Sequence, residues 1–221
     1  MIPFFKKQNK EYPDFWLAYM ATFDNPLPKD VSEVRFVVLD TETTGFDYTR
    51  DRILSIGALS LANGVIKVNE SLELFLEQKE HNPATVKVHG ILKDGPGTSI
   101  REETAIQELL NYLQNSPIVA HHAKFDIEMI NRALKRMGLP KLKNVHVDTS
   151  NLYGRSLLKS NLIDKRDSYS LDELAEKFGV SMKDRHTALG DAYITAMVFM
   201  RLLRLLKRKE GGISLSSLLK K

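Results

Sequence analysis

The chain has 221 residues, 43% of them hydrophobic and 27% charged, which is the composition of a globular protein with a sizeable core. Because it has no cysteine, the composition excludes disulfides, thiolate catalysis and zinc sites built on sulfur. Apolar runs fall short of the roughly 20 residues that a membrane-spanning helix needs, and the N-terminus turns polar too early for a signal peptide. We therefore expect a cytoplasmic protein with no membrane contact.

The net charge of +4 is unevenly distributed. From Arg201 onward there are seven Lys or Arg residues and one Glu, so this end is basic while residues 1–200 are slightly acidic. Two interpretations stay open. The basic residues could be the solvated end of a helix, where they also favour the helix dipole, or a patch that attracts phosphates or an acidic partner.

The first 33 residues predict an N-terminal arm with a short amphipathic helix. Its apolar members are Phe15, Trp16, Tyr19 and Met20. We expect this arm to pack on the domain of its own chain, although it could instead dock a partner.

Three strands are predicted next. The nearly all-apolar residues 34–39 are typical of a central strand that is covered on both faces. Residues 52–61 and 65–76 are separated by Asn63 and Gly64, which is a strong hairpin signal. The three strands therefore predict an antiparallel meander.

The rest of the chain alternates helices and short strands. Residues 82–91 predict a short helix and a turn, and residues 117–120 and 145–148 predict two short strands. Capping-box patterns at Ser99 and Ser170 predict the starts of two helices. Further helices are expected over residues 125–137 and 188–209, and after an N-cap at Asp148. This order predicts an α/β fold with a mixed sheet, an antiparallel three-strand meander plus parallel strands, flanked by helices.

Two carboxylates follow the first strand directly. On a strand, two side chains that are separated by one intervening residue point to the same side. Asp40 and Glu42 are therefore expected to lie close together in a mostly dry site. Such a pair is unfavourable unless a cation lies between the carboxylates, and a divalent metal ion is the usual solution. The pair is weak evidence by itself, because about one such spacing is expected by chance and Asp126 and Glu128 form a second.

Two later motifs complete the pattern. Residues 120–126 read A-H-H-A-K-F-D and place Asp126 just beyond a buried strand, where a helix opens. His186 lies in a loop, and Asp191 follows it in the first turn of the last long helix. Together with D-T-E-T-T-G-F at residues 40–46, these motifs resemble the DEDDh, or DnaQ-like, 3′–5′ exonucleases. That family includes the proofreading epsilon subunit of bacterial DNA polymerase III, RNase T and oligoribonuclease, and the resemblance covers about residues 34–205.

The resemblance implies a ribonuclease-H-like fold and two divalent metal ions, Mg²⁺ or Mn²⁺. Four carboxylates would hold these ions: Asp40, Glu42, Asp126 and Asp191. His186 would be the general base that takes a proton from the attacking water. Contacts to the terminal nucleotide would come from Thr43, Thr44, Gly45, Phe46, His89, His122 and Phe125. The chain is then divided into the arm (1–33), an exonuclease domain (34–209) and a C-terminal tail (210–221).

Two details concern the histidines. The family usually has Asn at the position of His122, so local hydrogen bonding is expected to differ, but activity is expected to remain because Asp126 is present. A second metal site built on His121, His122, His146 and Asp148 is not expected. Adjacent residues on an extended chain point to opposite faces and can hardly bind one ion.

The leading functional prediction is a 3′–5′ exonuclease that releases nucleoside 5′-monophosphates from single-stranded DNA, in proofreading or repair. An RNase-T-like or oligoribonuclease-like trimmer of RNA 3′ ends is the first alternative. The metal site would contact phosphate in DNA and RNA alike, and preference for one of them depends on whether the pocket binds the 2′-hydroxyl. A polymerase-binding or scaffold subunit is an alternative of another class. The expected partners are single-stranded DNA or RNA 3′ ends, with a DNA polymerase subunit left open.

Overall fold

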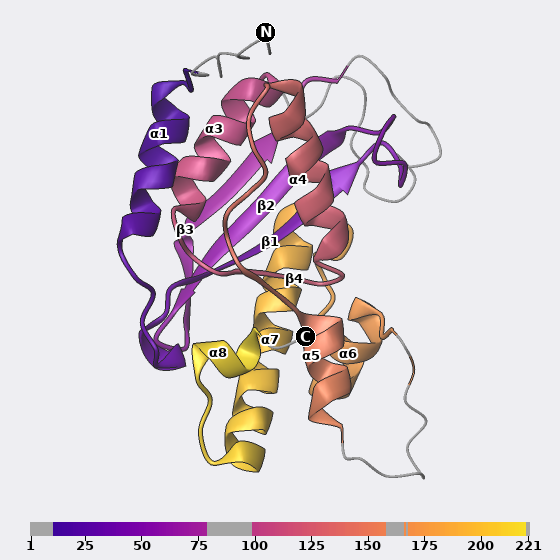
Figure 1. The fold of residues 1–221 in the computed structure, drawn as a ribbon. Helices are drawn as coiled ribbons and strands as arrows, with labels where there is room; N and C mark the ends of the chain where they lie inside the picture. Colours follow the sequence, from indigo (N-terminus) through magenta and orange to yellow (C-terminus); the bar gives the residue numbers. More distant parts are fainter. Residues whose placement is uncertain (1–10, 79–98, 158–165, 167, 220–221) are drawn as a thin grey trace, which may run out of the picture.

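The computed structural model describes residues 11–78, 99–157, 166 and 168–219 (Figure 1). The helix and turn predicted at residues 82–91, and with them His89, lie outside the described residues. Within the described part, five strands form one sheet in the order β3-β2-β1-β4-β5. They are β1 (Phe36–Thr43), β2 (Ile53–Ala62), β3 (Val65–Phe75), β4 (Ile118–Ala120) and β5 (His146–Asp148). The first three pair antiparallel, and β4 and β5 join in parallel, which confirms the predicted mixed sheet.

Helices cover both faces of the sheet (Figure 1). One face carries α1 (Asp14–Ala21), α3 (Glu102–Leu113) and α4 (Lys124–Arg136). The other carries α5 (Thr149–Ser156), α6 (Leu171–Phe178), the long α7 (Ala188–Glu210) and the short α8 (Leu215–Leu218). Two 3-10 turns, η1 (Thr22–Asp24) and η2 (Val31–Glu33), lead from α1 into β1. In the described part of the chain, no helix combines the length and apolar character that crossing a membrane requires.

The period-two alternation of β1 divides the interior into two cores. Val37 and Leu39 belong to the cluster beneath α3 and α4, whereas Phe36 and Val38 belong to the cluster beneath α7. Each cluster is built from fully buried aliphatic and aromatic side chains, whose burial is the main source of stability. The same alternation continues into the polar end of β1. Successive polar side chains there face in turn the helices α3 and α4 on one side of the sheet and α7 on the other.

Local sequence signals explain most of the element boundaries. The hairpin turn holds Asn63 and Gly64, both at positive φ, as its tight connection requires. The capping box at Ser170 is confirmed, and Asp148 caps α5 by accepting hydrogen bonds from the backbone of its first turn. The capping box predicted at Ser99 is wrong. The chain is held extended by a bridge between Ile100 and the end of β3, so α3 begins only at Glu102 and has no side-chain cap.

Both described ends of the chain pack on the main core. Trp16 and Tyr19 of α1 are buried, and the Tyr19 hydroxyl donates to Asn144 Oδ1 at 2.6 Å, which confirms that the arm packs on its own domain. At the other end, Leu215 and Leu218 are buried beneath α7 and α5. The division into arm, domain and tail stays a prediction.

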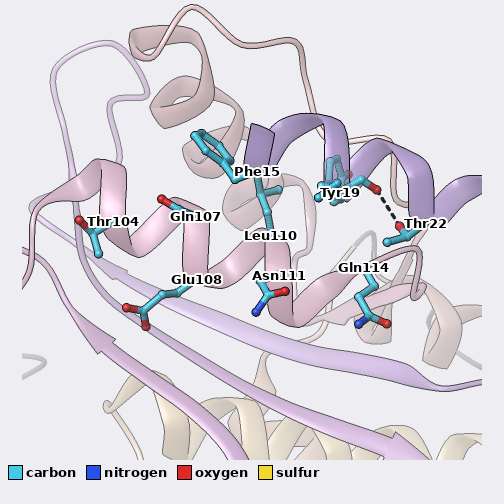
Figure 2. A pocket seen from close by; sticks show the side chains of 10 residues that line it. Phe15, Tyr19, Thr22, Thr104, Gln107, Glu108, Leu110, Asn111 and Gln114 are labelled. Atoms are coloured by element: carbon cyan, nitrogen blue, oxygen red, sulfur yellow. Dashed lines mark hydrogen bonds between the residues drawn. The ribbon is translucent and has the colours of Figure 1, made fainter. Parts of the chain in front are cut away.

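A cleft of about 490 Å³ lies between α1 and α3 (Figure 2). Its walls mix aromatic rings with amides and a carboxylate, among them Phe15, Gln107, Glu108 and Asn111. It lies on the α3 face of the sheet, opposite the face that α7 covers.

Candidate active site

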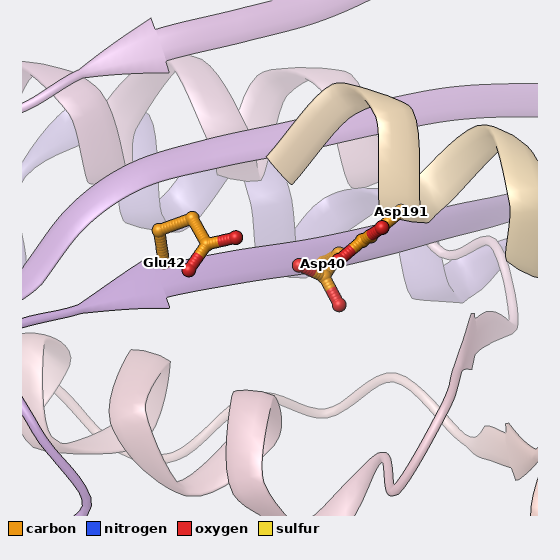
Figure 3. Close-up of side chains that lie close together, drawn as sticks. All are labelled: Asp40, Glu42 and Asp191. Carbon is orange, nitrogen blue, oxygen red and sulfur yellow. The ribbon is translucent and has the colours of Figure 1, made fainter. Parts of the chain in front are cut away.

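Three carboxylates converge where the end of β1 meets the start of α7 (Figure 3). Asp40 and Glu42 have the same parity on β1 as Val38, so both face α7. Asp191 lies in the first turn of α7, where Thr187 caps the helix through a hydrogen bond from the backbone of Gly190. One ligand oxygen from each of the three residues lies within 4.8 Å of the others. The spacing suits a cation held between them.

Two glycines that the sequence analysis missed allow this approach. Gly57 of β2 lies opposite Asp40 in the sheet, and a Cβ on it would lie 2.2 Å from the backbone of Ala188 and Leu189. A Cβ on Gly190 would lie 1.9 Å from the carbonyl oxygen of Asp184. Only glycine lets the start of α7 and its preceding loop pack this closely. A glycine inside a buried strand is itself a signal of close backbone approach.

Asp126, the fourth predicted ligand, lies in the first turn of α4 and is hydrogen-bonded to β1. Its Oδ1 accepts a hydrogen bond of 2.7 Å from Thr41 Oγ1, and Thr41 has the parity that faces α4. The carboxyl is buried in the first turn of α4, and this burial raises its pKa to about 7. Asp126 is outside the group of three, but its negative charge helps to raise the pKa of Asp40.

The electrostatics of the group indicate a deficit of positive charge. Burial first, and then the charges of Asp126, Asp191 and Glu42, raise the pKa of Asp40 well above its usual value. Burial and Asp191 raise the pKa of Glu42 to about 7. Burial also raises the pKa of Asp191, although Arg185 opposes the shift. Carboxyls that resist ionisation in this way are stabilised in their charged form by a bound cation.

The loop before α7 brings His186 and Arg185 to the site. His186 is exposed, adopts a left-handed φ of 68°, and donates its backbone N–H to Asp191 Oδ1 at 3.3 Å. The Arg185 guanidinium donates through Nη1 to Asp191 Oδ2 and through Nε to Asp172 Oδ1 on α6. Arg185 was not predicted as a site residue, although it stands next to the predicted base in the sequence.

Four of the residues predicted to contact a nucleotide form the end of β1 and the segment directly after it, namely Thr43, Thr44, Gly45 and Phe46. The hydroxyls of Thr43 and Thr44 hold the turn itself, donating to Gly45 O at 2.8 Å and Asp51 Oδ1 at 2.7 Å. Phe46 is 84% exposed, and its ring lies 5.7 Å from the ring of Phe125. The ring of Tyr48, a residue not predicted from the sequence, also lies 5.7 Å from the ring of Phe125. The structure thus brings Phe46 and Phe125 together, while their contact with a nucleotide stays a prediction.

Comparison with known proteins identifies the family. The profile of a protein family described as "Exonuclease" matches residues 37–199. The chain belongs to this exonuclease family. The predicted DnaQ-like, DEDD-family exonuclease is thereby confirmed, and the matched region contains all five residues of the proposed acidic and histidine constellation.

Sequence relatives of this exonuclease domain include polymerase components. A DNA polymerase III PolC-type protein of Thermotoga petrophila is 35% identical over 94% of this chain. A DNA polymerase III subunit epsilon-like protein of Rhodobacter capsulatus is 32% identical over 86% of it. The chain spans only 15% of the length of the first relative and 26% of the second.

Solved structures share the fold of the exonuclease domain. Exonuclease X in complex with 5′ overhanging duplex DNA superposes with a TM-score of 0.61 at 20% identity, over 83% of this chain and 97% of that one. E. coli Exonuclease I in complex with a dT13 oligonucleotide gives a TM-score of 0.67 at 18% identity, over 81% and 43%. These likenesses confirm the ribonuclease-H-like fold.

The donor set of the exonuclease domain fits the divalent metals that its family uses. Asp40, Glu42 and Asp191 offer only carboxylate oxygens, which are the ligands that Mg²⁺ and Mn²⁺ prefer. His121 and His122 lie in the turn between β4 and α4 with ring centroids 4.3 Å apart, so the expectation that they point to opposite faces is wrong. Among the described residues, their side chains do not belong to a group of three potential metal ligands. His121 Nδ1 instead lies 2.8 Å from Thr149 Oγ1, and burial lowers the pKa of His121 to about 4.

The backbone gives a reason for the unusual residue at position 122. His122 has a left-handed φ of 56°, a conformation in which Asn and His are both enriched. The substitution relative to the usual family residue therefore keeps a side chain that this backbone accepts. The exposed imidazole lies with Nε2 3.4 Å from Ser168 Oγ.

Proposed function

We propose that this chain is a metal-dependent 3′–5′ exonuclease that shortens single-stranded DNA from its 3′ end and releases nucleoside 5′-monophosphates. The observation that carries the proposal is the convergence of Asp40, Glu42 and Asp191 within 4.8 Å, in a domain of the exonuclease family. Two divalent ions held by these residues and Asp126 would lower the pKa of the attacking water and stabilise the leaving 3′ oxygen.

The protein's own residues have distinct parts in this reaction. Water attacks the phosphorus of the last internucleotide linkage, and the bond from that phosphorus to the 3′ oxygen breaks. The released 3′ oxygen takes a proton from solvent, so the shortened strand ends in a 3′-hydroxyl. His186 takes the proton of the attacking water, since its exposed loop position leaves the imidazole free to reach a substrate. The exposed ring of Phe46, backed by Phe125, stacks on a base near the 3′ end.

The DNA substrate and the polymerase connection rest on the relatives. The matched proteins named above are polymerase III proteins, and the two solved complexes hold DNA. We therefore place DNA ahead of RNA as the substrate and propose that the domain removes mismatched 3′ nucleotides in association with a DNA polymerase.

A time course with 5′-labelled single-stranded DNA, duplex DNA and RNA tests the proposal. Each substrate is incubated with Mn²⁺, with Mg²⁺ or with chelator, and Asp40→Asn is run beside the wild type. We expect a ladder that shortens one nucleotide at a time, fastest on single-stranded DNA and absent in chelator. Undiminished hydrolysis in excess chelator would contradict the metal site, and faster trimming of RNA would favour the ribonuclease alternative.

A further inference from the structure

Arg185 connects two helices at the edge of the acidic site. Its guanidinium binds Asp191 on α7 through Nη1, and Asp172 on α6 through Nε at 2.5 Å. The two contacts use different nitrogens, so the contact to Asp191 can open while the contact to Asp172 persists. The Arg185 side chain is only 22% exposed and that of Asp191 only 7%, so this pair is shielded from solvent.

The guanidinium partly neutralises the carboxylates in the structure as it stands. Its charge favours the ionised forms of Asp40, Glu42 and Asp191, against the burial and mutual repulsion that oppose ionisation. A divalent cation between these carboxylates would meet a positive guanidinium already bound to one of them. Two cations that share one buried carboxylate repel each other, and the repulsion is strong because water is largely excluded.

We propose that Arg185 is a resident counter-ion of the exonuclease site, which leaves Asp191 and stays with Asp172 when a divalent cation binds. The inference rests on the proposed function. Asp172 is suited to anchor the guanidinium because it lies in the first turn of α6, whose start is fixed by the Ser170 capping box. Arg185 is thus a positioning residue that sets metal affinity, and Asp172 is the carboxylate that keeps the Arg185 guanidinium when the metal binds.

Calorimetric titration of Mn²⁺ together with thermal unfolding of the metal-free protein tests this role. Arg185→Gln should bind Mn²⁺ about tenfold more tightly than wild type, because the competing cation is gone, and should melt at a lower temperature without metal. Asp172→Asn should bind Mn²⁺ about threefold more weakly, because the departing guanidinium loses its second partner.

Two further proteins control for general charge effects. In the Arg185→Gln background, Asp172→Asn should change Mn²⁺ affinity less than about twofold, as a double-mutant cycle requires if Asp172 acts through Arg185. Arg136→Gln removes an equal charge and an ion pair to Glu102 on the opposite face of the sheet, and should leave Mn²⁺ affinity unchanged.

The outcomes separate this inference from the proposed function. A wild-type protein that binds no Mn²⁺ contradicts the proposed metal site itself. A wild type that binds Mn²⁺ as tightly as Arg185→Gln, or more tightly, overturns the role of Arg185 alone. If Arg185→Gln does not fold, Arg185→Met takes its place. Methionine keeps an apolar stem of similar length but carries no charge, so it should likewise tighten Mn²⁺ binding, and failure to do so would overturn the proposal.

Discussion

His186 touches Asp191 through its backbone N–H, which leaves the imidazole available for proton transfer. If it is the general base, His186→Ala should lower kcat by roughly 10²–10⁴-fold while Mn²⁺ affinity stays near that of wild type. His122→Asn is the control, since asparagine suits the left-handed backbone at that position and most activity should remain. A full rate in His186→Ala would mean that the base has been misassigned.

Asp40 combines the two properties that a central metal ligand should show. It is repelled by three neighbouring carboxylates, so Asp40→Asn should raise the melting temperature of the metal-free protein while abolishing turnover. Asp14→Asn is a matched control, because it removes an exposed carboxylate from the first turn of α1 and should change neither property appreciably. Thermal unfolding in chelator and a single-turnover assay decide the matter. A variant that loses stability would show that Asp40 is structural.

At the scale of elements, much of the site followed from local rules. Period-two alternation placed Asp40 and Glu42 on one side of β1, and helix starts placed Asp126 and Asp191 in first turns. Contacts between elements could not be read in this way. Nothing in the spacing said that Arg185 reaches Asp172 on another helix, or that Thr41 donates a hydrogen bond to Asp126.

The close docking of α7 on the sheet gives an element-scale prediction. In Gly57→Ala the new methyl group would meet the backbone of Ala188 at 2.2 Å, which no side-chain rotation relieves. We expect a loss of stability of about 1–3 kcal/mol or more, with weaker Mn²⁺ binding because Asp191 moves with the helix. Gly154→Ala is the control. Its methyl would meet only Tyr169 at 3.7 Å, and alanine inside α5 should be neutral or stabilising by about 1 kcal/mol. Denaturant unfolding of both variants measures the difference.

At the scale of the whole molecule, the ends of the chain were the least predictable part. Residues 210–221 were predicted to be a C-terminal tail, with no contact predicted between them and the core. Instead Leu215 and Leu218 are buried, and Arg155 donates to the carbonyls of Ser217 and Leu218. Two apolar residues in a short segment do not indicate which part of the core they pack against. That contact depends on the tertiary structure and cannot be read from the local sequence.

The stability of the whole molecule should depend on pH in a way that the acidic site dictates. The pKa values of Glu42 and Asp126 are raised to about 7, and that of Asp40 is also raised well above its usual value. The unfolded chain has already released these protons near pH 4, so from there upward the folded state binds more protons than the unfolded state. Metal-free stability should therefore fall as pH rises through the folded pKa values.

The pH dependence of stability is best measured above the pH range in which His121 also changes its protonation between the folded and unfolded states. Burial lowers the pKa of His121 to about 4, so below about pH 6.5 the unfolded chain gains a proton there and the trend is opposed. Between about pH 7 and 8.5, the melting temperature in chelator should fall and the stabilisation by saturating Mn²⁺ should grow, because the metal binds the ionised carboxylates. Asp40→Asn should flatten the metal-free slope. A wild-type melting temperature in chelator that rises across this window would show that the four carboxyls are ionised without a metal, and that the site does not depend on a cation for its charge balance.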